Sequence, residues 1–244
     1  MQMIEDSLRA AGETIVHATI AGVRVHGGTA YSADTVDDLD VTVLYFVECA
    51  PKGGRPAGSV VIDHHRPGDP GYGRPPAEYA EASSLGQVLR VLGMGMGSTY
   101  LLMAAADHCL GAAYRGECPG VDPRELFTWR VEMRAKFQGR EPVAVRADII
   151  LAGDALREAQ VIAHGIRDVR GREIDELVEA AMVEGVAYMA TPRDAAGNVG
   201  AKVVIGNAWP EQVRWFMGEF AESHGLTGIY GDPARGFAGG QVAR

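Results

Sequence analysis

Cysteine is scarce in this sequence of 244 residues, and its spacing offers no disulfide framework. The three cysteines are Cys49, Cys109 and Cys118, and none of them forms a C-x-x-C pair. An odd number of cysteines suits a reducing compartment better than an oxidising one, where small proteins pair their cysteines. The cysteine content therefore predicts a cytoplasmic protein.

Long apolar runs and a basic amino terminus are also missing. Residues 1–13 carry Glu5 and Asp6 and lack the basic start and apolar core of a signal peptide. The most apolar long stretch, residues 101–113, is interrupted by Asp107 and His108 and is too short to span a bilayer, which takes about 20 residues. We therefore expect no targeting segment and no membrane partner.

Positive charge is in deficit, with a formal net charge of −9 and a pI near 5.3. Proteins that hold long nucleic acids need a basic surface to neutralise phosphates, so this charge argues against duplex DNA as a partner. A small anionic substrate at a metal ion is compatible with it, because a bound cation can outweigh nearby carboxylates. The sequence leaves a homodimer open.

The length and the hydrophobic pattern predict a two-domain α/β protein. Short β-rich runs at residues 23–26, 41–47 and 60–62 predict a mostly parallel sheet. This sheet is expected in a metal-binding domain over residues 1–120, together with helices at residues 78–92 and 98–114. The expected first domain is therefore a sheet covered by amphipathic helices.

Helix-forming residues dominate residues 122–162 and predict one or two helices, which are assigned to a helical linker over residues 121–170. Residues 171–244 are expected to form a second, smaller α/β domain for substrate binding. Its expected elements are helices at 174–184 and 210–223 and strands at 186–191 and 202–205. The glycine-rich end, residues 236–240, is typical either of a flexible terminus or of a phosphate-binding loop.

Each of the three predicted strands of the first domain ends in a side chain that can bind a metal ion. These side chains are His26, Glu48 and Asp63, and Asp63 is followed by His64 and His65. Ligands collect at the carboxyl ends of parallel strands, and carboxylate oxygens and imidazole nitrogens suit divalent transition metals. The pattern predicts a metal site, and the alternative is a polar turn after a strand.

Asp107 and His108 lie inside the predicted helix over residues 98–114, which is otherwise apolar. A buried carboxylate without a partner is very costly, and coordination of a metal ion would satisfy Asp107. The alternative places both residues on an exposed stripe of the helix, because charged side chains are rarely fully buried.

Taken in order, these residues resemble the DHH phosphoesterase superfamily, and most closely its branch of exonuclease-like proteins of the melanocyte-proliferating-gene type. The matching elements are His26-Gly27-Gly28-Thr29 with Asp34, Glu48 after the next strand, Asp63-His64-His65, Ser83-Ser84-Leu85-Gly86, Asp107, and Gly236 to Gly240. The resemblance implies a parallel-sheet metal domain joined by a helical linker to a smaller substrate-binding domain.

The resemblance also implies a role for each matching side chain. His26 and Asp34 would hold one ion, His64 and Asp107 would hold a second, and Glu48 would bridge the two. Asp63 would support a metal-bound imidazole, and His65 would face the substrate phosphate. Four residues are assigned to substrate binding: Arg66, Arg235, Gly239 and Gly240.

Four features depart from the family pattern. Ser32 stands two residues before Asp34, where a ligand is usual, and the spacing from His26 is one residue longer. Glu48 replaces the usual Asp, and the glycine-rich end lacks a preceding His. Asp37 or Asp38 could substitute for the missing ligand, although exposed loop carboxylates are the commoner state of Asp.

These features predict a metal-dependent phosphodiesterase or 3′–5′ exonuclease-like hydrolase with manganese as its first cofactor, magnesium or another divalent metal being the alternative. Two divalent ions would activate water and stabilise the charge of an in-line displacement. The expected substrate is a short oligonucleotide, a nucleotide or a dinucleotide. Two alternatives stay open: a DHH-like module that binds a nucleotide without cleaving it, because of Ser32, and a hydrolase with a single zinc ion.

Overall fold

The structure is a computed structural model that describes residues 2–26, 29–35, 41–192, 200–233 and 235–242. The chain divides into two units, which we call the first unit (Met1–Pro123) and the second unit (Arg124–Arg244), and each is described by itself. Among the described residues, no helix has both the length and the apolar character that a membrane crossing demands.

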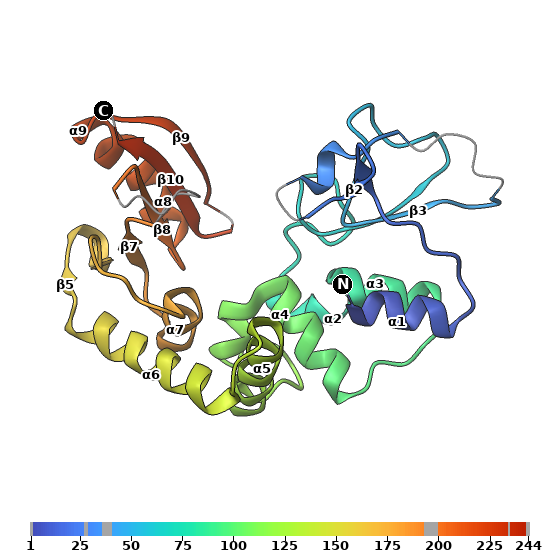
Figure 1. The fold of residues 1–244 in the computed structure, drawn as a ribbon, viewed down its shortest axis with the longest axis horizontal. Coiled ribbons are helices and arrows are strands. Elements are labelled where there is room, and N and C mark those ends of the chain that lie inside the picture. The colour runs from blue at the N-terminus through green and yellow to red at the C-terminus, as the bar shows by residue number, and fades with distance from the viewer. Residues whose placement is uncertain (1, 27–28, 36–40, 193–199, 234, 243–244) are drawn as a thin grey trace. The chain divides into compact units, whose positions relative to one another are not determined.

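The first unit packs three helices against a short pair of strands (Figure 1). Its core contains Ile4, Ile62, Leu85, Val88 and Leu89. The elements are α1 (Gln2–Ala10), β1 (Thr19–Ile20), β2 (Val23–Arg24), η1 (Ala30–Ser32), β3 (Tyr45–Val47), β4 (Val60–Ile62), η2 (Pro76–Glu78), α2 (Tyr79–Ala82), α3 (Ser84–Val91) and α4 (Ser98–Tyr114).

The strands β3 and β4 pair in parallel, with Val47 opposite Ile62. Phe46 and Ile62 are buried, as expected for apolar runs that pack against helices. The pairing continues for one residue beyond β3, because the Glu48 N–H donates to the Ile62 carbonyl at 3.0 Å. Glu48 and Asp63 therefore follow adjacent strands at the same edge, as the sequence predicts.

The expected central strand at residues 23–26 is wrong. Val23 and Arg24 instead form an exposed hairpin with β1. The turn residues Ala21 and Gly22 have φ angles of 50° and 80°, the left-handed pair that a tight two-residue hairpin requires. A β-rich run between turn residues is typical of a buried strand, but the hairpin leaves 70% of Val23 accessible to solvent.

The helix predicted over residues 78–92 is interrupted at Ser83. Ser83 adopts an extended conformation, and its hydroxyl accepts a hydrogen bond from the Gly86 N–H at 3.0 Å, so it caps α3. A Cβ atom on Gly86 would lie 1.6 Å from the Ala80 carbonyl oxygen. The chain therefore needs glycine at this position for the close approach of α3 to α2.

The helix predicted over residues 98–114 is confirmed as α4, although Gly97, rather than Ser98, occupies its N-cap position. Within α4, Cys109 has φ −155° and ψ 54°, which interrupts the helical conformation directly after Asp107 and His108. The carbonyl of Pro119, beyond the end of this helix, accepts a hydrogen bond from the Tyr79 hydroxyl at 2.9 Å.

The second unit contains a six-stranded sheet in the order β5-β6-β7-β8-β10-β9. Among the residues of this unit that the structure describes, only β6 and β7 pair in parallel. Its elements are α5 (Pro123–Gln138), α6 (Pro142–Glu158), β5 (Gln160–Val161), η3 (Ala163–Gly165), β6 (Arg167–Asp168), α7 (Leu177–Glu184), β7 (Tyr188–Ala190), β8 (Lys202–Gly206), α8 (Pro210–Trp215), η4 (Phe216–Phe220), α9 (Ala221–Ser223), β9 (Leu226–Asp232) and β10 (Phe237–Val242).

The chain is thus a mixed α/β protein, as predicted, but a mostly parallel sheet is not confirmed. Among the described residues, the named strands pair in parallel only at β3–β4 and β6–β7. The glycine-rich end forms β10, an antiparallel strand between β8 and β9. It was not recognised as a strand because glycine offers no apolar alternation.

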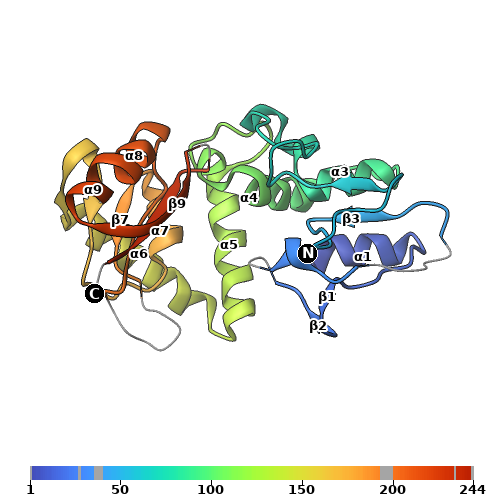
Figure 2. The same cartoon turned by 90° about the horizontal axis from the view of Figure 1, so that it is seen from above.

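Helices cover both faces of the six-stranded sheet (Figure 2). Tyr188, Ala190 and Val204 contribute to a core with α5, α6 and α7, whereas Met189 and Ile205 contribute to a core with α8 and η4. Successive residues of a strand point to opposite faces, so this alternation divides the side chains of β7 and β8 between two cores.

The long helices of the second unit follow the sequence prediction. The expected helical segment at 122–162 forms two helices, α5 and α6. The expected helix at 210–223 forms as α8, η4 and α9, with a π-helical turn at Phe216–Phe220. Glu179 of α7 is 1% exposed and is held by Arg130 and Arg134 of α5.

Candidate metal centre

Three side chains of the first unit offer ligand atoms that all lie within 4.8 Å of one another: Glu48, His64 and His65. All three are half-buried. Glu48 follows β3, and the two histidines follow β4, so the parallel pairing of these strands brings the residues together. We call this group the metal cluster.

Glu48 has an unusual backbone conformation, with φ of 52°. For a residue with a side chain this left-handed conformation costs on the order of 1 kcal/mol or more, and such residues concentrate at functional sites. The hydrogen bond from the Glu48 N–H to Ile62 holds this turn at the end of β3. The strained conformation therefore occurs at the end of β3, at the residue that the sequence predicts to be a metal ligand.

Asp63 contacts His65 of the metal cluster and is fully buried. Its Oδ1 accepts hydrogen bonds from the backbone N–H groups of His64 and His65, at 2.8 and 3.1 Å. The Tyr31 hydroxyl lies 3.1 and 2.9 Å from the two carboxylate oxygens. Burial acts to raise the pKa of Asp63, but hydrogen bonds from His65, Tyr31 and the backbone outweigh it, and the net pKa is lowered.

The Asp63 carboxylate also contacts the His65 ring, with Nδ1 of His65 2.9 Å from Oδ1. An ionised carboxylate accepts a hydrogen bond from this nitrogen, so the ring carries its hydrogen on Nδ1. A carboxylate that holds one ring nitrogen in this way is the common arrangement behind metal-bound histidines. Sequence reasoning assigned His65 to the substrate, whereas the structure brings it into the metal cluster.

Burial keeps His64 neutral. Its pKa is lowered to about 4 by burial first and then by the neighbouring His65 and His108. Nδ1 of His64 lies 3.1 Å from the Ser84 hydroxyl, and the rings of His64 and His65 are 4.1 Å apart. A metal ion binds neutral imidazole, so both the charge state and the position of His64 suit a ligand.

Asp107 lies beside His64, with 3.8 Å between its Oδ2 and Nδ1 of His64. Although 34% of its side chain is accessible, burial and the Glu48 carboxylate raise the pKa of Asp107 to about 7. Two carboxylates that disfavour each other's ionisation create a position where a cation is stabilised. The sequence prediction of a ligand at Asp107 agrees with this position, although Asp107 is outside the metal cluster.

His108, the residue after Asp107, also lies next to His64. Its ring centroid lies 5.3 Å from that of His64, and its Nε2 lies 3.0 Å from the Arg74 carbonyl oxygen. Nδ1 of His108 is buried and has no hydrogen-bond partner within the described part of the chain. The sequence pattern indicated this residue only through its place next to Asp107.

The structure does not bring His26 and Asp34 into the metal cluster among the described residues. His26 is exposed, and its carbonyl accepts a hydrogen bond from the Thr29 N–H at 2.8 Å. Asp34 accepts a hydrogen bond from the Ala21 N–H at 2.7 Å, so its carboxylate supports the β1–β2 hairpin. The candidates Gly27, Gly28, Asp37 and Asp38 lie outside the described residues.

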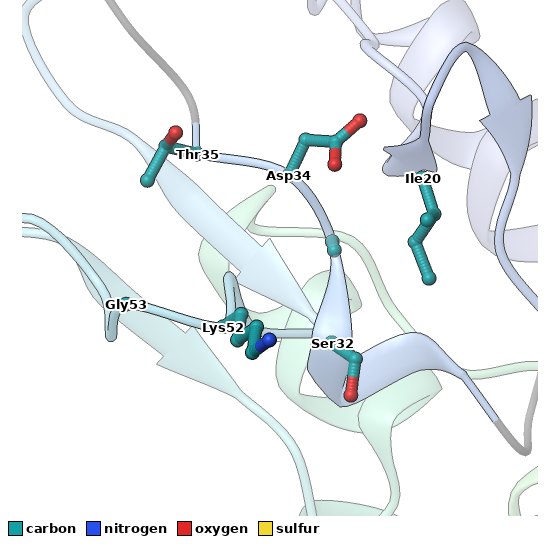
Figure 3. Close-up of a pocket in the computed structure, with 7 residues that line it drawn as sticks. Ile20, Ser32, Asp34, Thr35, Lys52 and Gly53 are labelled. Atoms are coloured by element: carbon teal, nitrogen blue, oxygen red, sulfur yellow. The ribbon is translucent and has the colours of Figure 1, made fainter.

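Asp34 and Ser32 instead line an open pocket of about 540 Å³, together with Lys52 and Ile20. Figure 3 shows the Asp34 carboxylate directed toward the hairpin that carries Ile20, and the Lys52 amine on the side of Ser32. A carboxylate, a hydroxyl and an ammonium group thus line one pocket.

Two arginines contact the pair formed by Tyr31 and Asp63, one on each residue. The guanidinium carbon of Arg66 lies 3.5 Å from the Tyr31 ring centroid. Arg55 lies 3.7 Å from Asp63 and donates hydrogen bonds to the Cys49 carbonyl. Burial and the neighbouring Asp63 raise the pKa of Tyr31 well above its usual range. Sequence reasoning missed Tyr31 and Arg55, because neither belongs to a recognised spacing.

The remaining substrate candidates belong to the second unit. Gly239 and Gly240 lie within β10, where a Cβ on Gly239 would meet the Tyr230 ring and one on Gly240 would meet Ile229. The Arg235 guanidinium carbon lies 5.7 Å from the Phe237 ring centroid. The role of these residues in substrate binding stays a prediction.

No protein-family model matches this chain, and no curated protein sequence matches it. A function is therefore inferred from the side chains of the site. The strongest of its features is that a buried carboxylate, Asp63, orients the imidazole of His65, which lies close to His64 and Glu48.

Proposed function

We propose that the protein is a metal-dependent phosphoesterase that hydrolyses phosphodiester bonds in a short oligonucleotide, a nucleotide or a dinucleotide. The observation that supports this proposal most strongly is the metal cluster, in which Glu48, His64 and His65 offer one oxygen and two nitrogen ligands within 4.8 Å. The resemblance to the DHH phosphoesterase superfamily supports the reaction class.

The cluster fits a divalent transition metal. Its two imidazoles and one carboxylate form a mixed donor set that manganese accepts more readily than magnesium, which prefers oxygen. Burial keeps His64 neutral, and the hydrogen bond to Asp63 orients the His65 ring. We therefore propose Mn²⁺ as the cofactor, held by Glu48, His64 and His65, with Asp107 beside them.

A divalent ion at this position would supply a water nucleophile at neutral pH and would polarise a phosphoryl oxygen. Asp63 orients His65, and Tyr31 in turn fixes Asp63 through its hydroxyl. Arg66, which covers the Tyr31 ring, is the residue that we assign to the phosphate oxygens of the substrate, because guanidinium binds phosphate through paired donors.

A two-ion centre would require further ligands besides Glu48, His64 and His65. His26 and Asp34 lie outside the metal cluster, and one oxygen of Asp34, Oδ2, already accepts a hydrogen bond from the Ala21 N–H. We therefore propose one ion at the metal cluster as the primary site, and the second ion predicted from the resemblance as a weaker one. The overall charge of −9 argues for a small substrate rather than duplex DNA.

Removal of the His64 imidazole tests the proposal. We expect the variant H64A to lose manganese-dependent release of nitrophenol from bis(4-nitrophenyl) phosphate, because a ligand is lost. The matched control is H17A, because His17 belongs to the same unit but lies outside the metal cluster. Among the described residues, the one ion pair of His17 is with Glu5, at 3.9 Å.

Circular dichroism of both variants should match the unaltered protein, so that a loss of activity can be assigned to the site. Unchanged manganese-dependent turnover by folded H64A would contradict the proposal. Equal loss in H17A would assign the effect to the fold instead.

The hydrogen bond between Asp34 and Ala21 favours a second candidate function, a module that binds a nucleotide without cleaving it. In this case Asp34 and Ser32 contribute no ligand, and the remaining site binds the phosphate without activating water. Turnover distinguishes the two functions: a binder retains a nucleoside monophosphate in equilibrium dialysis with manganese but releases no nitrophenol from the reporter.

A further inference from the structure

The sulfur atoms of Cys109 and Cys118 lie 3.2 Å apart in the first unit. Cys109 is part of α4, and Cys118 follows the end of this helix. Cys118 is buried, with 2% of its surface exposed, whereas Cys109 is partly accessible. The distance is short enough for a hydrogen bond between the two thiols, so the pair forms a site of its own, which we call the thiol pair.

A disulfide bond would require a small further approach of the two sulfur atoms. A disulfide bond has a length of about 2.0 Å, so the two atoms need to approach by about 1.2 Å. Cys109 already departs from helical conformation, with φ −155° and ψ 54°, so formation of the bond does not have to disrupt a regular helical turn at this residue.

The hydrogen bond also prepares the pair for oxidation. Either thiol can donate to the other, so each sulfur lies beside the group that would attack it once it is oxidised. Cys49, by contrast, has no sulfur partner among the described residues. Thiolates are the reactive form of cysteine, and a neighbouring thiol resolves the first oxidation product.

We propose that Cys109 and Cys118 form an oxidisable dithiol site that a peroxide converts into an intramolecular disulfide bond. One sulfur attacks the peroxide, forming an S–O bond while the O–O bond breaks, and becomes a sulfenic acid with release of water or an alcohol. The second sulfur then displaces water from the sulfenic acid, and the S–S bond forms. The two sulfurs lose two electrons in total, and the peroxide gains them.

The thiol pair lies next to Asp107 and His108 in sequence, because Cys109 directly follows them in α4. His108 contacts the His64 ring, so the disulfide would form one residue away from a side chain that lies against a candidate ligand. The oxidation chemistry does not depend on the proposed phosphoesterase function, and it can be measured without metal or substrate.

Peptide mapping tests the proposal. The full-length protein is treated with a small excess of hydrogen peroxide, unfolded in the presence of iodoacetamide, and digested with trypsin without reduction. Cleavage after Arg115 separates Cys109, in residues 91–115, from Cys118, in residues 116–124, while Cys49 remains in residues 25–52. A disulfide between Cys109 and Cys118 therefore joins two peptides that are otherwise released singly.

We expect one alkylated cysteine, Cys49, instead of three, and a joined pair of peptides that reduction separates. The matched control C49S should give the same joined peptides, whereas C118S should give none. Three alkylated cysteines after peroxide treatment, or joined peptides that contain Cys49, would overturn the proposal. A joined product found only in covalent dimers would overturn it as well.

Discussion

The Asp63 carboxylate is fully buried, and its hydrogen-bond donors come from Tyr31, the following backbone and the His65 ring. These contacts keep the carboxylate ionised in spite of its burial. An ionised carboxylate beneath an imidazole fixes both its tautomer and its orientation. At the residue scale, the geometry of the metal cluster therefore depends on a side chain that does not itself belong to the cluster.

The variant D63N tests this dependence. Asparagine has nearly the same shape as aspartate but no charge, so the proton on Nδ1 of His65 loses its ionised acceptor. We expect the affinity for manganese to fall by about 10- to 100-fold, the usual effect of removing a partner that orients a ligand. Isothermal titration of the metal-free protein with manganese measures this change.

The control for this measurement is Y31F, which removes a hydrogen bond to Asp63 but leaves the contact between Asp63 and His65. We expect a smaller loss of affinity in Y31F than in D63N. The same affinity in D63N and in the unaltered protein would show that Asp63 does not orient a metal ligand.

At the scale of elements, the junction between α2 and α3 positions Ser84 next to His64 and Gln87 next to Asp63. Ser84 contacts His64 at 3.1 Å, and Gln87 donates to the Asp63 carbonyl at 3.0 Å. The junction depends on the cap at Ser83 and on the close approach of Gly86 to the Ala80 carbonyl oxygen. A change in this approach would displace both helices that border the candidate centre.

We expect G86A to lower the free energy of unfolding by about 2 kcal/mol or more, because its Cβ would lie 1.6 Å from the Ala80 carbonyl oxygen and the helices would have to separate. Urea unfolding followed by circular dichroism measures the difference. The matched control is G95A, since a Cβ on Gly95 meets no atom within 4 Å. Equal stability of the two variants would contradict the close approach of α2 and α3.

At the scale of the whole molecule, each of the two units has its own core. In the second unit, Arg130 and Arg134 of α5 pair with Glu179 of α7 and with Glu176, which directly precedes α7. The Glu179 carboxylate is 1% exposed, so loss of a partner leaves a buried charge that water cannot solvate. These ion pairs therefore connect α5 to α7 and to the residue that precedes it.

We expect R130M to destabilise the protein by about 3 kcal/mol, the usual cost of removing one member of a buried ion pair. R140M is the control, because the pair that Arg140 forms with Asp148 is largely exposed, and such pairs contribute about 1 kcal/mol or less. Thermal unfolding of both variants measures the difference. Equal destabilisation would mean that burial of Glu179 does not determine the strength of its pairing.

The elements predicted best from the sequence are those with long periodic patterns. The helices α4, α5 and α6 were expected at nearly the observed positions, because amphipathic spacing over many residues is a strong signal. The hairpin at β1 and β2 and the break at Ser83 were missed, because each depends on two or three residues with special backbone angles or caps. The strand β10 was missed because its glycines carry no pattern.

For the candidate site, the sequence by itself determined that Glu48 and Asp63-His64-His65 follow short apolar strands, because apolar runs and polar ends can be read locally. Only the tertiary structure decided which of these side chains meet. The pairing of β3 with β4 brings Glu48 to the two histidines, whereas the hairpin binds Asp34 through Ala21. Distances between residues far apart in the chain depend on strand register and on hydrogen bonds that no local pattern contains.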